Sequence, residues 1–294
     1  MALVNLTDEC QQVDGGLAFL NSPNNLLERC FQDALGIGLG AFNAFDQIVA
    51  YATVHQDRNS DTEFARILGH VHPEFRKKGI GTYLIRWSEI QAQSWFTANG
   101  VNGQLRIATE SLTESADHLY RTHGFQSVFE ELVMERDLQQ PLPNLSIPPD
   151  VNFATWQAAL ADQFFQAYEA AFRERPGFPA YPAAVWISDY LENESFKPEW
   201  SLLARAGNQP VGFVTASSES SGGFVIQVGV IPEQRRRGLS SALITETMQL
   251  MKAAGLKETQ LAVNINNPGA IQTYTNLGFV TAGRRARYER IIER

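Results

Sequence analysis

The sequence has little of the features that are typical of disulfide-rich, membrane or nucleic-acid-binding proteins. Among 294 residues it has only two cysteines, Cys10 and Cys30, which gives no disulfide framework and favours a reducing, intracellular setting. It has no apolar run of about 18 residues and no signal-like start, so we expect a cytoplasmic protein with no membrane partner. Its net charge of −8 argues against nucleic acid as the main partner.

Histidine is too sparse and too scattered to indicate a metal centre. All five histidines fall in the first half of the chain. His70 and His72 have the alternate spacing that places two strand residues on one face, but no further ligand follows at a suitable spacing. We therefore expect no metal.

One short signature occurs twice, about half the chain apart. Both copies, at residues 71–81 and 230–240, end a β-rich run with Pro-Glu, continue as Arg-x-x-Gly-x-small and lead into an amphipathic stretch. Each is followed by Ala-x-x-x-Tyr-x-x-x-Gly-Phe, at residues 116–125 and 270–279. A repeat of this length indicates two structurally equivalent domains.

A proline-rich stretch separates the two copies. Prolines at positions 141, 143, 148 and 149 crowd a segment with few strong structure formers, which is typical of a semi-rigid spacer. We therefore expect an N-terminal domain at residues 1–138, a linker at 139–149 and a C-terminal domain at 150–294.

The hydrophobic pattern predicts the same order of elements in both halves: a strand hairpin, a third strand running into the turn, a helix, a strand, a short helix and a final strand. The first four strands are expected at 39–44, 48–54, 65–71 and 105–109, and in the second half at 200–206, 211–216, 224–230 and 259–265. This order indicates the α/β class, with helices packed on a mixed sheet. Before its hairpin the second half has an apolar helical stripe from Leu160 to Phe172, whereas the first half has much less material there.

A strand that feeds Arg-x-x-Gly-x-small into a helix suits a diphosphate. Small residues let the backbone approach the phosphates, and the helix N-terminus offers N–H groups and the positive end of its dipole. Basic side chains at 76–78 and 235–237 add local positive charge to an acidic protein. A glycine-containing loop with solvated basic residues is the alternative for either copy, but two copies with the same downstream motif favour the phosphate site.

The order of these motifs resembles the GNAT superfamily of acetyl-CoA-dependent N-acyltransferases. The second half matches it at Arg235, Gly238, Ser240, Asn267, Ala270, Tyr274, Gly278 and Phe279. The first half matches at Arg76, Gly79, Gly81, Ala116, Tyr120, Gly124 and Phe125, with Thr113 where Asn267 stands. As a tandem pair, the chain is similar to the mycothiol synthase type of double GNAT protein.

The resemblance implies two tandem GNAT-type domains with mostly antiparallel sheets, and acetyl-CoA as co-substrate. It also implies that strand backbone groups pair with the pantetheine arm, that the turn holds the pyrophosphate, and that Tyr274 (Tyr120 in the first half) protonates the leaving thiolate. The expected cofactor-binding residues are Val228, Val230, Arg235, Arg236, Arg237, Gly238, Leu239, Ser240 and Asn267, and in the first half Gly69, Val71, Arg76, Lys77, Lys78, Gly79, Ile80 and Gly81.

Neither strand before a turn has the carboxylate that family members often use as a base. A water held by Gln227 or Asn264, or a carboxylate such as Glu169, are open alternatives, and Glu63 lies just before the strand in the first half. The expected function is acetyl transfer to a primary amine of a small molecule by direct attack in a ternary complex, mainly in the second domain, where the aromatic stripe serves as core, acceptor wall or both. The alternative is a non-catalytic acyl-CoA-binding sensor or scaffold.

Overall fold

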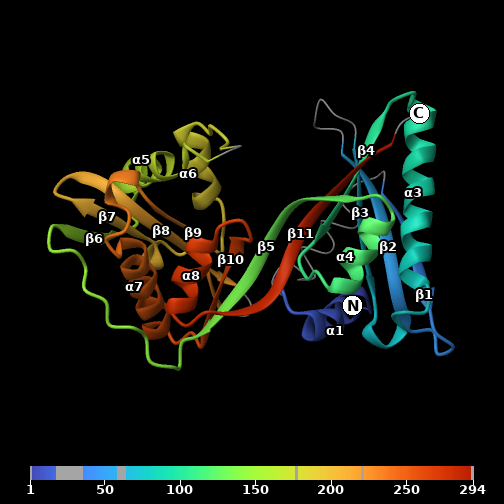
Figure 1. Cartoon of the computed structure of the whole chain (residues 1–294), viewed down its shortest axis with the longest axis horizontal. Helices are drawn as coiled ribbons and strands as arrows, with labels where there is room; N and C mark the ends of the chain where they lie inside the picture. The colour runs from blue at the N-terminus through green and yellow to red at the C-terminus, as the bar shows by residue number, and fades with distance from the viewer. Residues whose placement is uncertain (1, 18–35, 58–63, 176–177, 220–221, 293–294) are drawn as a thin grey trace. The chain divides into compact units, whose positions relative to one another are not determined.

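The structure is a computed structural model that describes residues 2–17, 36–57, 64–175, 178–219 and 222–292 (Figure 1). The chain forms two compact units. Unit 1 comprises Met1–Val133 and Ala282–Arg294, and unit 2 comprises Met134–Thr281. None of the helices in the described ranges is both long enough and apolar enough to cross a membrane.

Unit 1 is a mixed sheet with strand order β1-β2-β3-β4-β11-β5. β3 and β4 are parallel, whereas the β1–β2, β2–β3 and β4–β11 pairs are antiparallel. Its elements are α1 (Ala2–Asp14), β1 (Ile37–Phe42), β2 (Ile48–Asp57), β3 (Phe64–Val71), η2 (Pro73–Phe75), α3 (Ile80–Asn99), β4 (Gly103–Thr109), α4 (Glu114–Thr122) and parts of β5 (Gln126–Asp137) and β11 (Val280–Ile292).

Helices cover both faces of the unit 1 sheet. Cys10 of α1 packs with Tyr51 and Leu68 on one face, and Leu84 of α3 packs with Ala52 on the other. Because side chains alternate along a strand, neighbouring residues of β2 face different helices. The helix α1 lies where the sequence led us to expect little material, and residues 18–35 lie outside the described part of the chain.

Unit 2 repeats this arrangement with strand order β5-β10-β9-β8-β7-β6, in which β9 and β10 are parallel and the β6–β7, β7–β8 and β8–β9 pairs are antiparallel. An aromatic cluster packs α5 and α6 against one sheet face, and α7 lies on the other (Figure 1). The remaining elements are β6 (Val151–Thr155), η3 (Ala158–Leu160), α5 (Ala161–Phe172), α6 (Ala183–Leu191), η4 (Pro198–Trp200), β7 (Leu202–Ala206), β8 (Gln209–Glu219), β9 (Gly222–Val230), η5 (Pro232–Gln234), α7 (Leu239–Ala253), β10 (Glu258–Asn264) and α8 (Pro268–Asn276).

The expected α/β class, with two mixed, mostly antiparallel sheets flanked by helices, is confirmed. The compact units, however, do not follow the expected division at 1–138 and 150–294. β5 begins in unit 1 and belongs to unit 2 from Met134, and β11 begins in unit 2 and belongs to unit 1 from Ala282. Residues 286–292 of β11 pair with residues 103–109 of β4, so the last strand of the chain completes the sheet of unit 1.

Two arginines at equivalent positions accompany this exchange. Arg136 on β5 donates to the carbonyl oxygen of Leu277 at the end of α8, at 3.0 Å within unit 2. Arg290 on β11 donates to the carbonyl oxygen of His123 at the end of α4, within unit 1. The helix α8 of the second motif is therefore capped by β5, which follows the first motif. The helix α4 of the first motif is capped by β11, which follows the second motif.

Candidate active sites

The two Arg-x-x-Gly turns have the same backbone conformation. Lys77 and Arg236 both have φ of 60°, and the glycines that precede the helices, Gly79 and Gly238, have φ of 82° and 77°. The first N–H groups of α3 and α7 lack intrahelical acceptors, and left-handed residues beside such N–H groups are a common feature of anion-binding sites in proteins. A Cβ atom built on either glycine would meet nothing within 4 Å, so the mouth of each turn is open and fits a phosphate group.

A strand edge opens beside each turn. β3 pairs with β4 only as far as Ile67, and β9 pairs with β10 only as far as Val225. Beyond these residues the parallel strands separate. The N–H groups of His72 and Ile231 bond to the neighbouring antiparallel strand at 2.9 and 3.1 Å, so the residues one and three positions earlier direct their N–H groups to the open edge. These are Val71, Gly69, Val230 and Val228, the residues expected to pair with pantetheine.

In unit 1 the opening between the strands forms a cavity of about 430 Å³. This volume is ordinary for a small-molecule site. Its lining brings together most of the residues that the sequence predicted for the first half, namely Gly69, Val71, Arg76, Lys77, Gly79, Gly81 and Tyr120.

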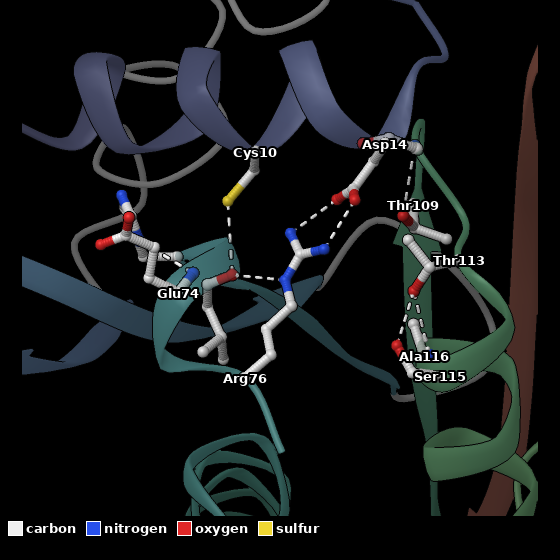
Figure 2. Close-up of polar contacts among 11 residues, drawn as sticks. Cys10, Asp14, Glu74, Arg76, Thr109, Thr113, Ser115 and Ala116 are labelled. Atoms are coloured by element: carbon white, nitrogen blue, oxygen red, sulfur yellow. Dashed lines mark hydrogen bonds and ion pairs between the residues drawn. The ribbon is translucent and has the colours of Figure 1, made fainter. Parts of the chain in front are cut away.

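The first arginine of the unit 1 turn is held by other protein groups. Arg76 donates two hydrogen bonds to the Asp14 carboxylate at 2.6 and 2.7 Å, and its Nε donates to the carbonyl oxygen of Val71 at 3.0 Å (Figure 2). The hydrogen bonds that Arg76 donates to Asp14 raise the pKa of Arg76. Cys10 donates to the same carbonyl at 3.4 Å, and burial raises the pKa of this thiol to about 11. We therefore assign Arg76 to fastening α1 onto the end of β3.

Arg235 makes the corresponding contacts in unit 2. Its Nε donates to the carbonyl oxygen of Val230 at 3.2 Å, and a second nitrogen donates to the carbonyl oxygen of Ala171 on α5 at 3.0 Å. In both units this arginine links the strand end to the helix that precedes the hairpin. Arg235 was predicted to be a cofactor-binding residue, and the contacts of its guanidinium group in the described residues are with backbone carbonyl groups.

The other basic residues of the turns differ in whether their side chains already have partners in the protein. Lys78 lies over an aromatic ring at 4.9 Å from its centre, and Arg237 pairs with Asp150 at 2.5 Å. Lys77 lines the cavity of unit 1. Arg236 has no hydrogen-bond or ion-pair partner in the part of the chain that the structure describes. Lys77 and Arg236, at matching left-handed positions, are therefore the side chains best placed to reach a phosphate.

The helix starts contribute backbone rather than side chains. Leu239 is only 2% exposed and packs into the core, and Ile80 packs beneath β2. The side-chain oxygen of Asn267 accepts a hydrogen bond from the N–H of Ala270 at 3.2 Å, which caps α8. Thr113 caps α4 in the same way at 3.1 Å (Figure 2), so this difference between the halves preserves the helix start.

The two motif tyrosines have different surroundings. Tyr274 on α8 is 9% exposed, and its ring centre lies 6.0 Å from that of Phe279. Tyr120 on α4 lines the unit 1 cavity, and its ring centre lies 5.0 Å from that of Tyr288. Burial raises the pKa of Tyr120 to about 12.

The structure describes the surroundings of three of the four residues that the sequence suggested for the general base or for holding a water in that role. Gln227 accepts a hydrogen bond from Tyr190 at 3.0 Å, and Asn264 accepts one from a neighbouring backbone N–H at 2.9 Å. Glu169 pairs with Arg173 at 3.2 Å along α5, and its side chain is 45% exposed. Glu63 lies outside the described residues.

Sequence reasoning missed a carboxylate in unit 1. Glu110 is 6% exposed, lines the cavity and pairs with Arg285 and Arg287 of β11 at 3.0 and 2.6 Å. The available signal was its position directly after a predicted strand, at 105–109. His72, one of the two alternate histidines, pairs with Glu9 at 3.0 Å and caps η2.

Comparison with known proteins agrees with this geometry. A family model described as "Acetyltransferase (GNAT) family" matches residues 161–279, and one described as "Acetyltransferase (GNAT) domain" matches residues 38–127. The chain therefore belongs to the GNAT acetyltransferase family, with one GNAT domain in each half, and is an acyltransferase by family. This confirms the family resemblance seen in the two motif copies.

Among curated proteins, mycothiol acetyltransferases are similar over most of the chain. The protein of Acidothermus cellulolyticus is 28% identical, over 83% of this chain and 76% of its own. That of Streptomyces scabiei is also 28% identical, over 95% and 88%. A solved GCN5-related N-acetyltransferase from Sphaerobacter thermophilus is 26% identical with a TM-score of 0.75, covering 100% of this chain and 92% of its own. A tandem GNAT protein from the clavulanic acid biosynthesis pathway shares the fold at 15% identity and a TM-score of 0.65, covering 99% and 94%.

Proposed function

We propose that the protein transfers an acetyl group from acetyl-CoA to a primary amine of a small molecule, by direct attack in a ternary complex. The observation that carries the proposal is an open, left-handed turn at a helix N-terminus beside a strand edge that has no paired strand among the described residues. The turn amides bind the pyrophosphate, and the open edge binds the pantetheine amides as an added strand. Acetyl-CoA supplies the thioester. The relatives named mycothiol acetyltransferase support a small-molecule acceptor.

Tyr274 acts as the general acid that protonates the leaving thiolate. Arg175, which follows α5, supports this role. Its guanidinium carbon lies 4.0 Å from the ring centre of Phe172. Desolvation lowers the pKa of Arg175, and the charge of the nearby Tyr274 phenolate would raise it. A cation beside the phenol stabilises the phenolate that remains after proton donation.

Unit 2 is the main catalytic unit, and unit 1 is mainly structural while able to bind CoA. Two features of unit 1 support this division. With a pKa of about 12, Tyr120 is a weaker acid than an ordinary tyrosine. The segment after α1 also lies across the end of the strands, because Gly16 donates to the carbonyl oxygen of Ala282 and Leu17 to that of Glu110, each at 3.2 Å. An acceptor amine would have to pass this segment.

The test is a pair of substitutions, Tyr274→Phe and Tyr120→Phe, in the full chain. Glucosamine, alaninamide, ethanolamine and propylamine serve as acceptors, and release of the CoA thiol is followed. Loss of the general acid in Tyr274→Phe should lower kcat about a hundredfold, while calorimetry shows acetyl-CoA affinity within about twofold of wild type. Tyr120→Phe should remain active. Loss of activity from Tyr120→Phe alone would reverse the assignment, and equal partial losses would mean two working sites.

A non-catalytic acyl-CoA sensor or scaffold is the second candidate. The observation that favours it is the sequence of β9, Gly222–Val230, which contains no carboxylate to serve as a base. This candidate predicts that acetyl-CoA binds tightly while no amine of the panel releases thiol above the rate without protein. Thiol release with any of these amines, lost in Tyr274→Phe, excludes it.

A further inference from the structure

Unit 2 has a β-bulge between β8 and β9, whereas the described residues of β2 and β3 in unit 1 pair without one. Along β8 and β9, Thr215 pairs with Gln227 and Ala216 with Val225, so Ile226 is an extra residue without a partner on β8. The bulge lies directly after Val225, the last residue of β9 that pairs with β10. The corresponding stretch of β2 and β3 keeps a regular register. Bulges of this kind redirect side chains next to active sites.

The bulge places two successive side chains on the same face of the sheet. Ile226 packs against the aromatic cluster under α5 and α6, and Gln227 accepts a hydrogen bond from Tyr190 of α6. In the regular strand of unit 1, successive residues at this point face opposite ways. Ile67 packs in the core with α3, and Leu68 packs against α1.

Tyr190 fixes the orientation of the Gln227 carboxamide. Its hydroxyl donates to Oε1 of Gln227 at 3.0 Å and lies 3.1 Å from the Thr215 hydroxyl. Its ring is 7% exposed and packs edge-on to Trp186, with ring centres 4.7 Å apart. Burial raises the pKa of Tyr190, so the phenol remains a neutral donor. With its oxygen engaged, half-buried Gln227 presents its NH₂ group as the end that can bind another molecule.

The described part of unit 1 has no equivalent of this group. Leu68 occupies the position of Gln227, and the buried hydroxyl of Thr53, which matches Thr215, has no hydrogen-bond partner within the described segments. The polar network is therefore specific to the unit that we propose to be catalytic.

We infer that Gln227 is a specificity-determining residue whose NH₂ group binds an oxygen atom of the acceptor next to its amino carbon, and that Tyr190 is the positioning residue that aims it. This inference rests on the proposed function. The substrate class is a primary amine with a neighbouring hydroxyl or carbonyl oxygen. An N–H donor suits such an oxygen better than the amine nitrogen itself, because the nitrogen lone pair must stay free to attack.

The test compares ethanolamine with propylamine, which have nearly the same shape and differ in one oxygen atom. The measured quantity is the ratio of their kcat/KM values, in which general damage to the enzyme cancels. Wild type should favour ethanolamine by about tenfold, the usual effect of one neutral hydrogen bond. The ratio should fall about tenfold in Gln227→Leu, which copies Leu68, and fall partly in Tyr190→Phe. The double variant should be no worse than Gln227→Leu, because the two side chains act as a unit.

Gln227→Glu separates recognition from structure. Glutamate can still accept the Tyr190 hydrogen bond, but it offers no N–H group. This variant is therefore assayed with 2-methoxyethylamine against butylamine, because the ether oxygen can only accept; the preference for the oxygen-containing amine should disappear while thermal stability is retained. Thr53→Val, at the matching position of unit 1, is the control and should leave the ratio unchanged. An unchanged ratio in both Gln227→Glu and Tyr190→Phe overturns the inference while leaving acetyl transfer intact.

A binding measurement covers the case in which no panel amine is acetylated and the proposed function fails. The side-chain NH₂ resonance of Gln227, assigned by its absence in Gln227→Leu, is followed in the CoA complex by NMR. Ethanolamine should shift this signal and propylamine should not, and Tyr190→Phe should reduce the shift. A signal that responds equally to both amines, or to neither, overturns the inference independently of turnover.

Discussion

Substitutions of two buried aromatic residues near the C-terminus should destabilise different units. Phe279 is 2% exposed and packs against Tyr274 in unit 2, whereas Tyr288 is fully buried in the core of unit 1 with Phe96 and Phe125. Removing a buried aromatic ring costs about 3–5 kcal/mol. In a unit of this size that lowers the melting temperature by about 10 °C or more. Tyr288→Ala should therefore destabilise unit 1, and Phe279→Ala should destabilise unit 2.

Hydrogen exchange read by mass spectrometry locates each effect. In Tyr288→Ala, peptides from β3, β4 and α3 should lose protection, while those from β8, β9 and β10 keep it. Phe279→Ala should give the opposite pattern. Loss of protection in β8–β10 from Tyr288→Ala, with β3 and β4 unchanged, would refute the assignment of the last strand to unit 1.

Three further predictions concern the site and its titrating groups. Gly238→Val should weaken acetyl-CoA binding in calorimetry more than about tenfold, because valine is strained at a φ of 77° and adds bulk at the open turn; unchanged affinity in a folded variant would contradict the assignment. Arg175→Met should lower kcat with little change in acetyl-CoA affinity, and Arg173→Met, which removes a surface pair with Glu169, should not; equal effects on kcat would exclude a role for the Arg175 charge. Burial raises the pKa of Cys10 from 9.0 to about 11 and that of Tyr120 from 10.0 to about 12, so folded unit 1 holds protons that the unfolded chain releases. The stability that these groups contribute is present below pH 9 and should be lost towards pH 12, and denaturation midpoints that do not fall over this range would contradict it.

Local sequence patterns were enough to predict most of the sheet. The strands expected at 65–71 and 224–230 are Phe64–Val71 and Gly222–Val230 in the structure, because β-rich runs bounded by Pro-Glu leave little freedom. The helix Ala2–Asp14 was missed. It buries only Leu6, Thr7 and Cys10, which is too narrow a stripe to stand out in the sequence.

Features of the candidate site that depend on local backbone conformation could be predicted from the sequence. Features that depend on contacts with residues remote in sequence could not. Gly79 and Gly238 were predicted from the motif, in which small residues let the backbone approach a phosphate, and in the structure both have the left-handed conformation that glycine adopts readily. The structural role of Arg76 depends on Asp14, which is remote in sequence, so the arginine resembled a phosphate ligand. Gln227 was noticed as a polar residue, but its direction depends on a bulge that no residue type announces.

The strand exchange was invisible for a different reason. In each half, a strand follows Gly-Phe. The residues of that strand would suit either arrangement, whether the strand completes the sheet of its own unit or that of the other unit. Arg136 and Arg290 show this equivalence, since each caps the helix that the other would cap without exchange. The observed pairing of β11 with β4, together with these two arginine contacts, distinguishes the two arrangements.

Cleavage of the linker tests this exchange directly. A protease site inserted between Asn144 and Leu145 lies in an exposed stretch without secondary structure, so cutting there should leave the folded units unaffected. The expected domains at 1–138 and 150–294 would then separate as independent fragments. In the structure, by contrast, residues 286–292 of the second fragment pair along β4 of the first, and Tyr288 is buried in its core. The two fragments should therefore co-elute in size-exclusion chromatography at the mass of the intact chain and separate only in denaturant. Separation under native conditions would mean that the last strand is not part of unit 1. A cut chain that carries Tyr288→Ala provides the matched comparison, because its fragments should separate at a lower denaturant concentration than those of the cut wild type.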